Sequence, residues 1–150
     1  SPKALQCMAE NAYDAIRRIY PDSTKYEANY RKLHAKLVDL DNRTARRIEE
    51  SGIRMFVIYH PALTYFARDY GLQQIAIEDE GKEPSARHLA RLIEQARAQK
   101  IRNIFYQSQF PASTVEIIAH DIGATAVRID PLREDAIANI EEITCLITAR

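Results

Sequence analysis

The sequence lacks several features that mark common functional classes. No apolar run approaches the roughly 20 residues of a membrane-spanning helix, and 21 Lys and Arg balance 21 Asp and Glu. This balance leaves no overall basic excess for binding nucleic acid or an anionic membrane surface. The sequence has no GxSxG motif, glycine-rich phosphate loop or HExxH motif, so it offers no recognisable signature for nucleophilic, nucleotide-dependent or metalloprotease chemistry.

Cysteine, glycine and proline are also scarce. The two cysteines, Cys7 and Cys145, have no CxxC spacing and therefore do not form a metal site by themselves. Both fall in predicted helices, and free, partly buried thiols are favoured over a disulfide, which would need the first and last helices to pack side by side. The four glycines and six prolines fall at the ends of predicted elements, as a consistent fold requires.

The first third of the chain has a helical pattern. Ser1 and Pro2 resemble a helix cap followed by proline at the first helical position, and Pro21 ends that helix. A second apolar stripe continues to Ile48 and predicts a helix of about 26 residues, or ~39 Å, ended by Ser51-Gly52. The stripe consists of Tyr26, Tyr30, Leu33, Leu37 and Leu40.

Beyond residue 51, short apolar runs alternate with helical patterns, which predicts right-handed crossovers and a parallel sheet. The fold class is therefore α/β: a four-stranded parallel sheet with helices on both faces, preceded by a helical segment with one long helix. We expect two parts, 1–51 and 52–150. The expected strands are 55–59, 74–77, 103–106 and 124–129. The expected helices between and after them are 62–70, 84–99, a helix that follows Pro111, and 134–148. In the helix after Pro111, Ser113 and Glu116 have the spacing of a capping box.

Two of these strands end in a polar residue followed by proline: His60-Pro61 and Asp130-Pro131. Ligands bind outside the carboxyl ends of strands in open parallel sheets, and imidazole and carboxylate suit a divalent metal. His60 and Asp130 are therefore the candidate metal ligands. By themselves, a buried histidine bonded to the backbone and a turn or helix-cap aspartate fit the same pattern.

Other chemically capable residues have simpler interpretations. His34, His88 and His120 fall in helices and are expected to be solvated surface residues, although His120-Asp121 could form a weak adventitious site. Glu78–Glu80 belong to a polar stretch without the calcium-loop pattern, so we expect a solvated loop. Tyr65 and Phe66 are expected in the core and at the wall of the cleft.

An ordered set of segments resembles the C-terminal lobe of the periplasmic solute-binding proteins of zinc and manganese ABC transporters, a group that includes adhesion lipoproteins. Ser1-Pro2-Lys3 resembles the residues that follow this family's Asp-Pro-His-x-Trp motif, and the long helix resembles the one that joins its two lobes. No single motif is specific, but the ordered set covers essentially the whole chain. Its segments are Val57-Ile-Tyr-His60, Tyr70-Gly71-Leu72, Glu83-Pro84-Ser85, Gln109-Phe110 and Asp130-Pro131-Leu132.

The resemblance implies metal capture for transport. In this family four protein ligands, two from each lobe, hold the ion, and His60 and Asp130 occupy the positions of the C-terminal pair. We therefore expect a C-terminal part without its N-terminal lobe, binding zinc only weakly by itself and self-associating. Histidine at position 60 favours zinc, with manganese as the alternative, since glutamate there accompanies manganese. The resemblance also implies a membrane permease as partner, which the surface around Glu78–Glu80 could face instead of forming only a solvated loop. It further implies a periplasmic or other extracytoplasmic location, and the sequence leaves open whether the intact protein is membrane-anchored. Gln107 and Arg133 depart from the family's usual acidic residue and glycine.

Two other functions remain open on the sequence. A small α/β enzyme could use His60 as a general base and Asp130 as its orienting or metal-binding partner. However, no nucleophile or oxyanion hole can be assembled beside that pair. The second alternative is an interaction module that docks through the apolar stripe between Tyr26 and Leu40.

Overall fold

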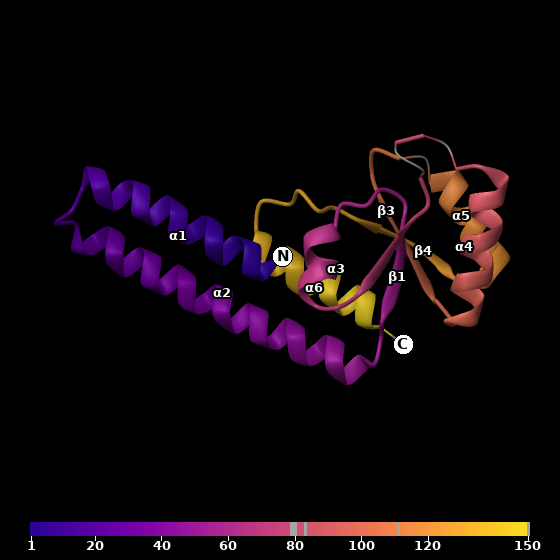
Figure 1. The fold of residues 1–150 in the computed structure, drawn as a ribbon, viewed down its shortest axis with the longest axis horizontal. Coiled ribbons are helices and arrows are strands. Elements are labelled where there is room, and N and C mark those ends of the chain that lie inside the picture. The colour runs from indigo at the N-terminus through magenta and orange to yellow at the C-terminus, as the bar shows by residue number, and fades with distance from the viewer. Residues whose placement is uncertain (79–80, 83, 111, 150) are drawn as a thin grey trace.

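Two long helices form an antiparallel hairpin that projects from an α/β lobe (Figure 1). The computed structural model describes residues 1–78, 81–82, 84–110 and 112–149. Helix α1 spans Pro2–Ile19 and α2 spans Thr24–Ser51. The 28 residues of α2 give a length of about 42 Å at a rise of 1.5 Å per residue. The long helix expected from the sequence is therefore confirmed, and it continues three residues beyond Ile48.

The ends of these helices follow local chemistry with one exception. The Ser23 hydroxyl accepts a hydrogen bond from the Tyr26 N–H at the start of α2, and Gly52 ends the helix in the left-handed region at φ 68°. Ser1 was expected to cap α1, but its hydroxyl instead donates to Asp69 Oδ2 at 2.5 Å. Asp69 is the last residue of α3 (Thr64–Asp69), so this bond ties the start of α1 to the lobe.

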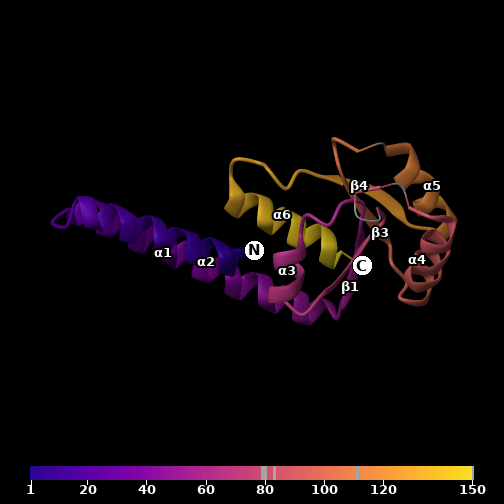
Figure 2. The ribbon, with the colours of Figure 1, turned by 45° about the horizontal axis from the view of Figure 1, so that its top comes forward.

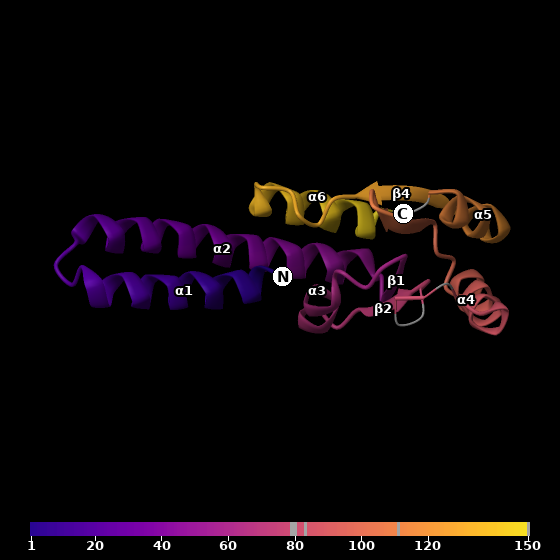
Figure 3. The ribbon, with the colours of Figure 1, turned by 90° about the horizontal axis from the view of Figure 1, so that it is seen from above.

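The two halves of the hairpin are packed differently. Only the half of α2 nearest the lobe has buried side chains, and these begin at Leu37 and continue to Ile48. In the far half, the rings of Tyr13 and Tyr30 stack with centroids 4.4 Å apart, while Tyr20 and Tyr26 are exposed. The near half of α2 is therefore part of the lobe's core, whereas the far half packs against α1 alone (Figure 3).

The lobe is built on a four-stranded parallel sheet, as the sequence predicted, and the structure gives the strand order as β2-β1-β3-β4. Ile58 of β1 pairs with Ala76 of β2 and with Phe105 of β3, and Gln107 of β3 pairs with Ile129 of β4. This register fixes which residues meet beyond the carboxyl ends of the strands. The strands are β1 (Met55–Ile58), β2 (Gln73–Ala76), β3 (Asn103–Gln107) and β4 (Thr125–Ile129).

Helices cover both faces of the sheet, which confirms the predicted layers (Figure 2). One face packs against α2, α3 and α6 (Ala136–Thr148), and the other against α4 (Ala86–Ala98) and α5 (Ala112–Ile122). Along β1, Phe56 and Ile58 enter the first core and Val57 enters the second, because successive side chains of a strand point to opposite faces. The strands therefore lie between two separate hydrophobic cores.

Some details differ from the expectations. Ser113 lies inside α5 rather than before it, and Pro111, expected to open that helix, is outside the described residues. Cys7 and Cys145 are free, as favoured, but both are exposed rather than partly buried, because each lies on the outer side of its helix. In the described part of the chain, no helix combines the length and apolar character needed to cross a membrane.

Candidate metal site at the carboxyl edge of the sheet

His60 lies two residues beyond β1, at the point where the chain reverses its direction across the sheet. From β1 the chain proceeds to β2 on one side and later to β3 on the other. Such a topological switch point is where open parallel sheets bind ligands. The Tyr59 N–H still donates to the Phe105 carbonyl at 2.8 Å, so ordered pairing continues up to His60. Its side chain is 45% exposed, and the predicted position at the sheet edge is therefore observed.

The His60 ring is held by Glu78, which the sequence interpretation placed in a solvated loop. His60 Nδ1 lies 2.7 Å from Glu78 Oε1, and the Glu78 side chain is only 8% exposed. That expectation was wrong for Glu78 because the position falls on the continuation of β2 beside β1; Asp79 and Glu80 lie outside the described residues. The β1–β2 register joins residues 18 apart in sequence, and the same offset links His60 to Glu78.

Two residues from the end of β3 and the segment after it complete the surroundings of His60. β3 is the second strand that pairs with β1. Gln107 at the end of β3 is 1% exposed, and its Nε2 donates to the His60 carbonyl at 2.9 Å. Its Oε1 has no hydrogen-bond partner among the described residues. The Phe110 ring stacks on the imidazole with centroids 5.5 Å apart and an interplanar angle of 25°. The histidine therefore has a fixed backbone and one covered ring face.

Asp130 directly follows β4 and is exposed. One of its carboxylate oxygens, Oδ1, accepts from the Leu132 N–H at 3.0 Å. Its carbonyl accepts from Nδ2 of Asn139, a buried side chain of α6, at 2.8 Å. The turn role considered for Asp130 is therefore present. It uses Oδ1 and leaves Oδ2 outside the turn.

His60 and Asp130 share one edge of the sheet, but β3 lies between their strands. At about 4.8 Å between neighbouring strands, the two strand ends are about 10 Å apart. A shared ion would therefore lie above the end of β3, between the two side chains. In the described residues no group of three or more His, Cys, Asp and Glu could hold a metal ion. The edge presents two donors of the predicted types, short of the four that a closed zinc site uses.

The other histidines lie away from His60, and the expectation that they are solvated holds for one of them, His120. His120 is solvated as expected: its side chain is 91% exposed and its Nδ1 is 3.8 Å from Asp121 Oδ1. His88 is half-buried rather than solvated, because its Nε2 lies 3.0 Å from the carbonyl of Ala76 in β2.

His34 is also half-buried rather than solvated, since its ring lies beside Tyr30 with centroids 5.7 Å apart. Phe66 is in the core as expected, but Tyr65 is 64% exposed. None of these residues adds a donor beside His60.

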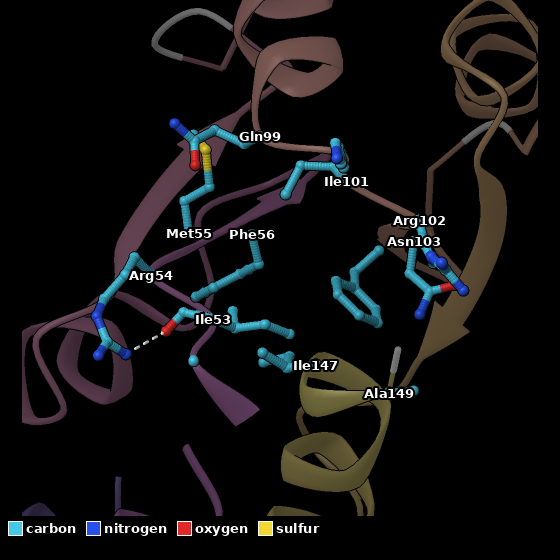
Figure 4. A pocket seen from close by; sticks show the side chains of 13 residues that line it. Ile53, Arg54, Met55, Phe56, Gln99, Ile101, Arg102, Asn103, Ile147 and Ala149 are labelled. Atoms are coloured by element: carbon cyan, nitrogen blue, oxygen red, sulfur yellow. Dashed lines mark hydrogen bonds between the residues drawn. The ribbon is translucent and has the colours of Figure 1, made fainter. Parts of the chain in front are cut away.

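A cavity of about 330 Å³ lies at the opposite, amino-terminal edge of the strands. Figure 4 shows Phe56, Ile101 and Ile147 around its interior and Arg54 and Arg102 nearer its rim. No His, Cys, Asp or Glu is among the described residues that line it. This cavity therefore lacks metal-ligating side chains among its described lining residues, and His60 is not one of them.

A parallel α/β lobe on a long helix, with an imidazole and a carboxylate at its ligand-binding edge, is the arrangement expected of a metal solute-binding lobe. Comparison with protein families identifies the class more narrowly. The family described as ZnuA, zinc-uptake complex component A, periplasmic, matches residues 1–142. The chain therefore belongs to this family.

Individual proteins agree with this assignment. The chain is 29% identical over 135 residues to the zinc-binding protein AdcA of Streptococcus pyogenes serotype M3 and 31% identical over 127 residues to the high-affinity zinc uptake system protein ZnuA of Bacillus subtilis. These matches cover 88% and 83% of this chain but only 26% and 40% of the relatives. A crystal structure of ZnuA has a TM-score of 0.91 at 35% identity, covering 99% of this chain and 58% of that one.

The chain thus spans between a quarter and two fifths of the length of these curated relatives. The family is described as a component of a zinc-uptake complex, which is a transport component and not an enzyme. The alternative of a small α/β enzyme built on His60 and Asp130 therefore has no support from the family.

Proposed function

We propose that this chain is the C-terminal part of the substrate-binding component of a metal ABC transporter. In this proposal 1–51 forms the helical segment with the inter-lobe helix and 52–150 forms the C-terminal lobe. The complete protein captures a divalent cation between two lobes and delivers it to a membrane permease. The family match over residues 1–142 supports the transport role.

The observation that carries the proposal is the hydrogen bonding and exposure of the His60 side chain at the switch point of the sheet. Its Nδ1 is occupied by the buried Glu78 carboxylate, while 45% of the side chain remains exposed. Among the described residues no hydrogen bond involves the other ring nitrogen, Nε2, and this nitrogen is the one proposed to bind an ion in the cleft. Asp130 supplies a carboxylate oxygen from the same edge, and the two are proposed as this lobe's ligands.

Zinc is the proposed cargo, with manganese as the alternative ion. Imidazole suits zinc, whereas manganese favours oxygen ligands such as carboxylate and water. The names of the two relatives, a zinc-binding protein and a zinc uptake system protein, point the same way. The family's description as periplasmic supports an extracytoplasmic location for the parent protein.

Two protein ligands make a weak site. A closed tetrahedral zinc site uses four, so the remaining two are assigned to a second lobe that faces this edge. We expect the chain alone to bind zinc much more weakly than the complete protein, because the ion must retain water at its other positions.

The test is calorimetric titration of zinc into the chain and into three variants, with manganese in parallel. His60→Ala and Asp130→Ala should each remove most of the measurable zinc binding, and manganese should bind more weakly than zinc. His120→Ala is the matched control, because that side chain is 91% exposed and lies in α5 away from the edge. Zinc binding that persists unchanged in both site variants would reject His60 and Asp130 as ligands.

Self-association of the chain is a second, separate expectation. The base of the hairpin has an apolar hollow lined in part by Leu5, Met8 and Leu33, and Met8 and Leu33 are 63% and 42% exposed. A second copy of the chain could bury these side chains. Sedimentation velocity at increasing concentration should show dimers that Leu33→Glu weakens; a monodisperse monomer at high concentration would contradict this expectation.

A further inference from the structure

We propose that Glu78 is the positioning residue for His60: it holds the imidazole in the Nδ1–H tautomer, so that the lone pair of Nε2 faces the cleft. This inference rests on the proposed function of His60 as a ligand for the cargo ion. It assigns a role to an acidic residue that is neither a proposed ligand nor part of a solvated loop.

The position of Glu78 is set by the backbone. The Ile77 N–H donates to the Ile58 carbonyl at 2.9 Å, and the Glu78 N–H donates to the Tyr59 carbonyl at 3.1 Å. These bonds continue the pairing of β2 with β1 beyond the strand ends. The Glu78 carboxylate therefore projects from ordered backbone, at the position that the β1–β2 register places opposite His60, and it does not need to reach across from a loop.

The two partners have different environments. The Glu78 side chain is 8% exposed, whereas the His60 side chain is 45% exposed. A carboxylate that is so little exposed requires hydrogen-bond donors, and His60 Nδ1 is one at 2.7 Å. The buried Glu78 carboxylate therefore orients the more exposed His60 ring. A metal ligand needs such exposure, because the ion reaches it from the solvent.

The tautomer follows from the chemistry of the pair. An ionised carboxylate only accepts hydrogen bonds, so the ring nitrogen that faces it must carry the proton. In a neutral imidazole the other nitrogen then has the lone pair that binds a metal. A carboxylate bonded to the distal nitrogen also raises the basicity of a histidine ligand, and such partners contribute about 10–100-fold to metal affinity or activity.

The remaining restraints on His60 do not select a tautomer. Gln107 bonds to the backbone carbonyl, and Phe110 covers a ring face. Neither contact involves a ring nitrogen. Among the described residues, the hydrogen bond to Glu78 is the one that distinguishes Nδ1 from Nε2, so removing it should release the tautomer while the other restraints remain.

The first test is nitrogen NMR of the metal-free chain with labelled histidine, at about pH 8.5, two units above the ordinary histidine pKa of about 6.5. His60 should be in the Nδ1–H form in the unaltered chain and in Glu78→Gln, whose amide oxygen can still accept. In Glu78→Ala it should exchange between both forms. Asp121→Asn, beside exposed His120, is the matched control and should leave His60 unchanged. An Nε2–H tautomer in the unaltered chain would overturn the proposal.

The second test is zinc titration of the same variants. Glu78→Ala should bind zinc about 10–100-fold more weakly, Glu78→Gln should lose less, and Asp121→Asn should match the unaltered chain. A changed tautomer with unchanged zinc affinity would overturn the positioning role while leaving His60 a ligand. By contrast, zinc binding that survives His60→Ala would reject the proposed function itself, whatever the tautomer. If Glu78→Ala does not fold, the unaltered chain and Glu78→Gln still decide the tautomer.

Discussion

The two ends of the candidate site share one kind of support and differ in another. At each end a buried side-chain amide donates to the backbone carbonyl of the proposed ligand: Gln107 to His60 at 2.9 Å and Asn139 to Asp130 at 2.8 Å. The His60 ring is further held by Glu78 and Phe110, whereas among the described residues the carboxylate of exposed Asp130 accepts one hydrogen bond, from the Leu132 N–H of its own turn.

This comparison indicates that the two proposed ligands differ in how firmly their side chains are oriented. Both backbones are held by a buried amide, so both proposed ligands start from defined positions. One side chain is oriented before the ion arrives, and the other keeps freedom to adjust to it. An ion that needs further ligands from a second lobe would then meet one rigid and one adaptable donor.

The largest expected effects come from the two amides. Gln107→Ala and Asn139→Ala each remove a buried donor and leave a carbonyl less well satisfied, which should lower the free energy of unfolding by about 1–3 kcal/mol. Urea unfolding followed by circular dichroism measures both. Similar losses would support equal backbone support at the two ends, whereas a neutral Asn139→Ala beside a costly Gln107→Ala would show that only His60 is anchored.

The next effect separates the turn role of Asp130 from its ligand role. Asp130→Asn keeps an oxygen for the Leu132 N–H but loses the charge, so we expect zinc binding to weaken at least about tenfold, or 1.4 kcal/mol, with stability nearly unchanged. Asp130→Ala should lose zinc binding and also about 0.5–1.5 kcal/mol of stability. Calorimetry and urea unfolding give both values. An Asn variant that binds zinc normally would leave Asp130 as a turn residue only.

A hydrogen bond remote from both ends provides a baseline for effects on stability alone. The Tyr70 hydroxyl donates to Asp41 Oδ1 at 2.7 Å and joins α2 to the lobe. Tyr70→Phe should cost about 1 kcal/mol of stability without changing zinc affinity. A loss of zinc affinity in this variant would show that stability and binding are not separable here.

The same residue predicts a pH dependence. Burial, and then the bond to Asp41, raise the pKa of Tyr70 above its ordinary value. The folded state therefore holds this proton more tightly than the unfolded state does. The resulting stability is complete below about pH 10 and is lost as the pH rises through the folded-state pKa. Above about pH 10, unfolding of the unaltered chain should become easier relative to Tyr70→Phe; parallel curves for the two would contradict this.

The smallest expected effect concerns the stacked ring. Phe110 contacts Tyr59 and His60, with ring centroids 4.8 Å and 5.5 Å away. Phe110→Leu keeps an apolar cover but removes the aromatic contacts, which are worth about 0.5–1.5 kcal/mol. We expect a small loss of stability and a loss of zinc affinity smaller than that of Glu78→Ala. A larger loss would make Phe110, and not Glu78, the main restraint on the ring.

The sequence was sufficient for the architecture because the local signals agreed with one another. Each strand lies within one residue of its expected bounds, and Gly52 ends the long helix where a left-handed residue was expected. His60 and Asp130 could also be identified from the sequence, because each is a polar residue between a predicted strand and a proline. Their positions at one edge follow from the parallel arrangement alone.

Glu78 could not be identified in this way. It begins an acidic stretch that is indistinguishable in composition from a solvated loop, and its role depends on the pairing of β1 with β2 in one register. The offset of 18 residues that joins Ile58 to Ala76 and His60 to Glu78 is a property of the folded sheet. His88 was missed for a similar reason, because its partner is a backbone carbonyl of a distant strand.

The placement of Glu78 beyond an edge strand has a consequence for how the site would open. In the part of the chain that the structure describes, β2 is an edge strand paired with β1, and strands with few neighbours open more readily than central ones. If β2 separated from β1, Glu78 would move away from the imidazole. The His60 ring is therefore oriented by Glu78 only while β2 stays paired with β1. A cation that binds the oriented ring must therefore hold the edge strand shut. Zinc should then slow amide hydrogen exchange along β2, although β2 itself supplies no ligand.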